Sequence, residues 1–149
     1  MNRQQKWILS NFILVILITF TSVAGMIELK NWVNRSEATR AMESLKNAVA
    51  EYKNKNGFIP PGSYVDGIIK TFEGQSRLGT LVYRARWIAF DSPPNTILAY
   101  VKKNFHSIFY HPGVIVLRID GRIEWMDKPA FDKALAAQQT PLEIETEPK

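Results

Sequence analysis

The clearest hydrophobic pattern lies at the beginning of the chain. Residues 7–27, WILSNFILVILITFTSVAGMI, contain no charged side chain. About twenty such residues in a helix cross the roughly 30 Å hydrocarbon core of a membrane. We therefore predict a transmembrane helix over residues 7–29. A cleaved secretory signal is the alternative, with SVAG (22–25) as a loose cleavage site, but its apolar region would be shorter.

A second pattern, with helical spacing, follows the apolar run. Over residues 36–57, apolar side chains recur at the i, i+3, i+4, i+7 positions of one helix face. Asn and Gly at the end of NKNG, followed by Pro60-Pro61, end this helix. No proline or glycine separates Ile27 from Ser36, so we predict one continuous helix from about Trp7 to Asn54, roughly 70 Å long. Its apolar face comprises Ala38, Ala41, Met42, Leu45, Ala48, Val49 and Tyr52.

Beyond Pro61 the pattern becomes that of β-strands. Runs rich in aromatic and β-branched residues are separated by turn-forming residues such as SPPN. They predict strands within 80–91, 96–101, 107–110, 113–119 and 122–126, then a short helix over 128–138. The fold class predicted is α+β, with a long N-terminal helix, transmembrane and then amphipathic, packed along its second half on a small antiparallel sheet.

This reading divides the chain into five parts. The soluble part, a small β-rich head, would hold about a hundred residues together with the amphipathic helix, enough to fold alone. The parts are a short basic tail (1–6), the transmembrane helix (7–29), the amphipathic helix that continues it (30–57), the head (58–137) and a flexible tail (138–149).

The Asp-Gly pair at 120–121, between two apolar strands, predicts a β-hairpin. A two-residue loop would mix apolar and charged side chains on each face. A three-residue loop over 120–122 instead sets Arg118 against Glu124 on the solvent side, with Gly121 in the left-handed conformation. It also pairs Ile119 with Ile123 and Leu117 with Trp125. We therefore expect Asp120 and Gly121 to shape the turn, and four side chains to be buried together: Leu117, Ile119, Ile123 and Trp125.

The charge distribution gives little support for nucleic-acid binding. The formal net charge is +5, but the basic residues are scattered. Arg84 and Arg86, which would share one face of a strand, come nearest to a nucleic-acid stripe, and a solvated strand face explains them as well. At the two ends of the apolar run, Trp7 and Trp32 are predicted membrane-interface anchors. Arg3 and Lys6 join them on the N-terminal side.

The residues that carry chemistry are few. The chain has no cysteine, which excludes disulfides, thiolate zinc sites and thiol catalysis. Its two histidines, His106 and His111, have no acid at a metal-ligand spacing and no serine partner in a catalytic motif. We therefore expect neither an enzyme nor a cofactor nor a metal site.

Two stretches together resemble a known family. An apolar helix running into an amphipathic one, then AVAEYKNKNGFIPP and a β head, resembles the type IV pilin and type II secretion pseudopilin superfamily. Some bacterial pseudopilin-like proteins also close with a His-x-Gly…Val-Leu-x-x-Asp-Gly-His-Val-Glu-Trp string. Arg122 and Ile123 replace the His-Val of that string. The matching residues are His111, Gly113, Val116, Leu117, Asp120, Gly121, Glu124 and Trp125.

The resemblance covers most of residues 7–131 and implies a structural subunit of the bacterial inner membrane. The N-terminus would lie in the cytoplasm and the head in the periplasm, an orientation that the count of basic residues does not supply. Its partners would be membrane lipid and other membrane protein subunits. The alternative is an accessory subunit of a larger inner-membrane complex, which docks through the span and covers an exposed surface with the head.

The chain departs from the family at the leader peptide. Prepilins carry a Gly-Phe cleavage site and a glutamate five residues into the mature helix, where this chain has Asn11-Phe12 and Ile16. Cleavage before Phe12 would also leave about sixteen residues to cross the membrane, fewer than the usual minimum of about seventeen. We therefore expect the mature chain to keep Arg3 and Lys6.

Overall fold

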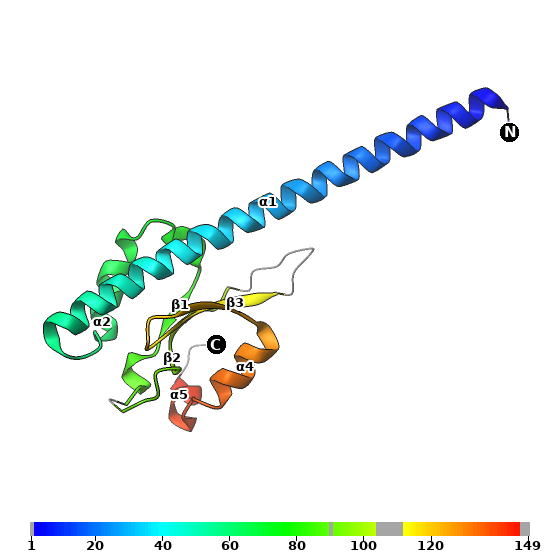
Figure 1. The fold of residues 1–149 in the computed structure, drawn as a ribbon. Coiled ribbons are helices and arrows are strands. Elements are labelled where there is room, and N and C mark those ends of the chain that lie inside the picture. The colour runs from blue at the N-terminus through cyan, green and yellow to red at the C-terminus, as the bar shows by residue number, and fades with distance from the viewer. Residues whose placement is uncertain (1, 90, 104–111, 147–149) are drawn as a thin grey trace.

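The computed structural model describes residues 2–89, 91–103 and 112–146. The longest element is the helix α1 (Arg3–Asn56), which carries a small α+β head at its C-terminal end (Figure 1). Its 54 residues span about 80 Å at 1.5 Å per residue. The helix ends at Gly57, whose positive φ of 84° lets its N–H bond back to the Lys53 carbonyl. The continuous helix predicted from the sequence is confirmed.

The head contains a four-stranded antiparallel sheet in the order β1-β2-β3-β4. Its strands are β1 (Leu81–Tyr83), β2 (Ile97–Val101), β3 (Gly113–Arg118) and β4 (Ile123–Asp127). Consecutive strands are neighbours throughout, so the sheet is a simple meander. The predicted fold class, a long N-terminal helix packed on a small antiparallel sheet, is therefore observed.

Helices cover both faces of the sheet. On one face, the predicted apolar face of α1 packs against β2 and β3. Five of its side chains are buried, those of Ala38, Ala41, Met42, Leu45 and Val49. On the other, α4 (Lys128–Ala136) packs Phe131 and Leu135 against Tyr100, Val114 and Val116. Because both faces are covered, all five residues of β2 are buried.

The segment between α1 and the first strand, over which no strand was predicted, is helical. It forms α2 (Gly62–Ile68), a 3-10 turn η1 (Ile69–Thr71) and α3 (Gln75–Leu78). Gly74, which precedes α3, has a φ of 79°, and a Cβ built on it would lie 2.3 Å from the Glu37 carbonyl oxygen. This close backbone approach seats α3 on α1, where Arg77 pairs with Glu37.

The hairpin turn was predicted correctly in length but wrongly in position. The three-residue loop is Ile119-Asp120-Gly121, not 120–122, so Leu117 pairs with Ile123 and Ile115 with Trp125. In a three-residue hairpin loop the left-handed residue is classically the third, after a type I turn, and Gly121, with φ 83°, is that residue. The shift moves each pairing by two residues in total, which keeps the same side chains on the α1 face. Leu117, Ile119, Ile123 and Trp125 therefore do pack in one cluster, although only Leu117 is fully buried.

The expected solvent-side pair Arg118–Glu124 forms, but diagonally and half-buried. Arg118 lies directly opposite Arg122 through a backbone hydrogen bond, and its guanidinium reaches Glu124 across the strands. It also donates to the Asn95 carbonyl oxygen. Arg118 is therefore held by several partners instead of standing in water.

Two further expectations are wrong because of one buried contact. Residues after Tyr83 leave the strand and form a 3-10 turn, η2 (Ala85–Trp87), so Arg84 and Arg86 do not share a strand face. The expected flexible tail instead forms α5 (Pro141–Thr146). Arg84 and Glu143 meet in the interior, which explains both differences. The expected strand over 107–110 lies outside the described residues.

Candidate assembly surface on the N-terminal helix

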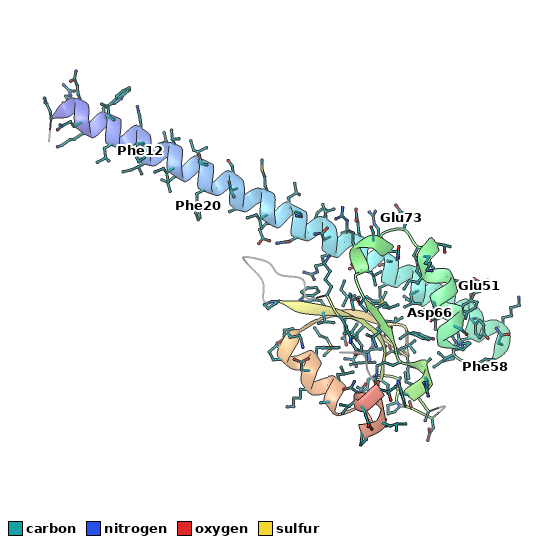
Figure 2. All side chains as sticks on the ribbon, turned by 180° about the vertical axis from the view of Figure 1, so that it is seen from behind. Phe12, Phe20, Glu51, Phe58, Asp66 and Glu73 are labelled. Atoms are coloured by element: carbon teal, nitrogen blue, oxygen red, sulfur yellow. The ribbon has the colours of Figure 1, made fainter. Side chains whose placement is uncertain are left out.

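The N-terminal half of α1 projects away from the head (Figures 1 and 2). The helix is long and apolar enough to cross a membrane, and the most apolar 18-residue window in it has no buried residue. Phe12 and Phe20 stand out from this half with none of the head beside them (Figure 2), and Phe20 is 77% exposed. An apolar surface of this extent is expected to be covered by lipid or by protein.

Three hydroxyl groups of the projecting half are satisfied within the helix. The hydroxyls of Thr19, Thr21 and Ser22 each donate to the carbonyl four residues earlier, at 2.8 Å. Such bonds remove the cost of placing a hydroxyl in hydrocarbon. The backbone needs no partner along the span because the helix continues without a break.

The predicted interface anchors Trp7 and Trp32 have exposed side chains. Trp7 and Trp32 are 69% and 67% exposed, so neither ring is used by the head. Arg3 and Lys6 lie in the first turns of the helix, which begins at a capping box between Asn2 and Gln5. Each indole therefore has its apolar face and its N–H available to a membrane–water boundary.

The head begins with no linker after the apolar run. The first fully buried residue of α1 is Ala38, and Arg35, one turn before it, lies over the Trp125 ring at 4.1 Å. Trp125 in turn fills the space beside Gly113, where a Cβ would lie 2.5 Å from the indole. The glycine and tryptophan of the quoted C-terminal string are thus placed in contact, at the level where α1 enters the head. The helix thus enters the head without a break.

The predicted turn residues have structural roles. The Asp120 carboxylate accepts hydrogen bonds from the backbone N–H of Arg122 at 3.0 Å and from its side chain at 2.6 Å. These bonds, the backbone one foremost, lower the pKa of the Asp120 carboxyl below its usual value. Backbone N–H groups of the turn also donate to the Thr96 and Pro94 carbonyls, which ties the hairpin to the preceding loop.

Sequence reasoning missed a buried ion pair between Arg84 and Glu143. The side chains are 1% and 5% exposed, and two N–H groups of the guanidinium contact the two carboxylate oxygens at 2.6 and 3.0 Å. The remaining donors reach the Ile97 carbonyl at 2.8 Å and Gln138. The one available signal was weak, since Glu143 stands between the apolar Leu142 and Ile144. We call this set, Arg84, Gln138 and Glu143, the C-terminal clasp.

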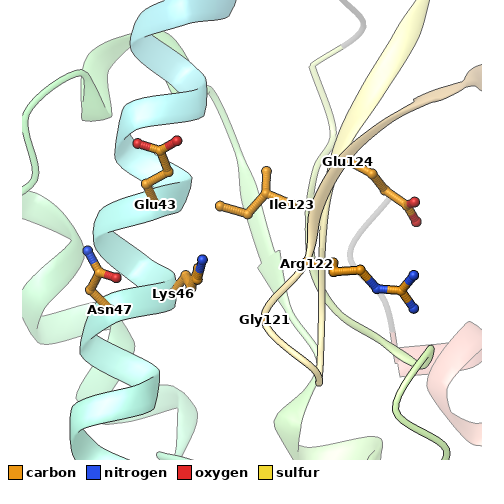
Figure 3. A pocket seen from close by; sticks show the side chains of 7 residues that line it. All are labelled: Glu43, Lys46, Asn47, Gly121, Arg122, Ile123 and Glu124. Carbon is orange, nitrogen blue, oxygen red and sulfur yellow. The ribbon is translucent and has the colours of Figure 1, made fainter.

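A polar hollow lies between α1 and the β3–β4 hairpin (Figure 3). Glu43, Lys46 and Asn47 line it from α1, and Ile123 points toward them from the hairpin. Arg122 and Glu124 point away from the helix (Figure 3). One acid and one lysine across from an apolar side chain do not make a catalytic arrangement.

Within the described residues, no group of three or more His, Asp or Glu side chains could hold a metal ion. His106 and His111 lie outside that part of the chain. The comparisons with known proteins found no matching family model, curated protein or solved structure. The projecting half of α1 is therefore the feature from which a function can be argued.

Proposed function

We propose that this protein is a non-enzymatic, single-pass membrane subunit of pilin or pseudopilin type, which assembles through its N-terminal helix. One observation carries the proposal. The same uninterrupted helix contributes to the core of the head with its second half and has no buried residue in the apolar window of its first half. A helix that served only the head would need no such extension.

The absence of a spacer between span and head supports this role. Ala38, which is buried, lies only about 17 Å beyond Ile27, the last residue of the apolar run, at 1.5 Å per residue. The head therefore stands next to the membrane surface and follows every movement of the span. Subunits whose spans pack side by side would hold their heads in a fixed array.

We place the span in the bacterial inner membrane, with residues 1–6 in the cytoplasm and the head in the periplasm. This orientation rests on the resemblance to pseudopilins. Because the chain has no cysteine, single cysteines can test it. In intact cells with a permeabilised outer membrane, an impermeant maleimide should label Gln75→Cys and not Asn2→Cys. The reverse pattern would refute the orientation.

Membrane insertion is tested separately, by extraction of cell membranes with alkaline carbonate. The full chain should stay in the membrane pellet, and a Leu14→Lys, Leu17→Lys variant, with two charges in the span, should not be retained. Release of the unaltered chain would refute the proposal. A matched Gln4→Lys, Gln5→Lys variant, charged only before the span, should remain in the pellet.

The second candidate is an accessory subunit of a larger inner-membrane complex. Ile16 favours it, because an acid at this place would supply the charge that pairs with a neighbouring subunit's amino terminus in a filament. Purification from native membranes distinguishes the two. A structural subunit should co-purify mainly with further copies or pilin-like chains, and an accessory subunit with unrelated membrane proteins at fixed stoichiometry.

A further inference from the structure

We propose that Asn11 forms a hydrogen-bonded contact inside the membrane with Asn11 of a second copy of this chain. The inference rests on the proposed function, because it requires α1 to span a membrane. It names the partner and the contact that the helix would use. The residue stands out because its polar group is the largest in the apolar run.

The Asn11 carboxamide makes no hydrogen bond within the described residues, whereas Thr19, Thr21 and Ser22 are satisfied by their own helix. It lies four residues inside Trp7, about 6 Å deeper along the axis. The side chain has two N–H donors and a carbonyl acceptor. A bond to the carbonyl four residues earlier, as Asn56 makes to Tyr52, would satisfy only one of the three. The others need a partner that hydrocarbon does not provide.

A second copy supplies this partner at the correct depth. Two copies of one single-pass chain insert the same way round, so their position-11 side chains lie at equal distances from the membrane surface. A carboxamide donates and accepts, which makes it complementary to itself across a two-fold axis. An unrelated helix would need a polar side chain at that same depth by coincidence.

The face that carries Asn11 also allows close approach. At about 100° per residue, Ile18, Ser22 and Gly25 lie within about 40° of Asn11 around the helix. Phe20 lies on the opposite side, about 180° away. The small side chains at 22 and 25 let a neighbouring backbone come near, as is common in helix pairs within membranes. The bulky ring would face lipid.

Cysteine cross-linking of the full chain in phosphatidylethanolamine–phosphatidylglycerol vesicles tests the contact. Under an oxidant, Ile18→Cys should form a disulfide-linked dimer and Phe20→Cys should form little. Adding Asn11→Leu to Ile18→Cys should weaken dimerisation by about threefold to thirtyfold. The control, Thr19→Val added to Ile18→Cys, should change nothing, because that hydroxyl is satisfied within its own helix.

Equal cross-linking on the two faces, or dimerisation unaffected by Asn11→Leu, would overturn the inference. So would an entirely monomeric chain in these vesicles. Carbonate extraction of the same samples separates this failure from failure of the proposed function, since a chain that is inserted but monomeric keeps the span and loses only the contact. Intact mass of the sample confirms that residue 11 is present.

Discussion

The C-terminal clasp should stabilise the head far more than an ordinary ion pair. The Glu143→Leu change removes the carboxylate and leaves a similar apolar volume. Arg84 cannot then turn to water, because its own backbone N–H is bonded to the Leu98 carbonyl at 2.8 Å and its side chain is 1% exposed. Removing one partner of a buried pair costs about 3–5 kcal/mol. For a head of about a hundred residues, this should lower the melting temperature by more than about 10 °C.

Thermal unfolding of the full chain in detergent, followed by circular dichroism, measures this loss. The exposed pair Arg77–Glu37 supplies the matched control, since its side chains are 49% and 37% exposed. Arg77→Ala should cost less than about 1 kcal/mol. The double variant Arg84→Met, Glu143→Leu should recover most of the stability, because a well-packed apolar pair replaces a buried ion pair at little cost.

Two results would refute the reasoning. The first is that Glu143→Leu destabilises the head no more than Arg77→Ala does, which would mean that α5 is not docked in solution. The second is that the double variant loses as much stability as Arg84→Met and Glu143→Leu lose together when measured separately, which would mean that the charges are not coupled.

Three further expectations concern single positions. Gly74→Ala should lower the free energy of unfolding, measured with urea, clearly more than Gly57→Ala does. Both glycines have positive φ, which costs about 1–2 kcal/mol for a residue with a Cβ, but only at Gly74 would the Cβ meet backbone atoms. Equal losses would contradict the packing of α3 on α1. Burial raises the pKa of the Tyr83 hydroxyl well above 10.0. The neutral side chain therefore contributes its full stabilisation of the head below pH 10, and this contribution decreases as the pH rises further. Tyr83→Phe should weaken that loss of stability at alkaline pH. At neutral pH it should cost about 1 kcal/mol, because the hydrogen bond to the Pro60 carbonyl is lost. An unchanged dependence of stability on alkaline pH would refute the role of Tyr83. Finally, intact mass of the membrane-extracted protein should retain the residues before Phe12, and a chain that begins at Phe12 would return the protein to the processed filament subunits.

The sequence by itself determined the elements whose pattern is local. The apolar stripe from Ala38 to Val49 repeats every three to four residues, and no glycine or proline separates it from the span, so one helix follows from periodicity alone. β2, β3, β4 and α4 were likewise found within a few residues of their observed bounds. Even the face of the hairpin was correct, because a shift by an even number of residues leaves the alternation of side chains unchanged.

Contacts between distant parts of the chain decided the rest. The position of the hairpin loop depended on Gly121 being its third residue, and on hydrogen bonds to the Pro94 and Thr96 carbonyls that no local pattern predicts. In the sequence, Arg84 and Glu143 look like solvated charges. Each is buried only because it pairs with the other, 59 residues distant in the chain. A buried charge is tolerated only beside its partner, so neither residue could be placed from its own neighbours, and the helix α5 that carries Glu143 could not be placed either.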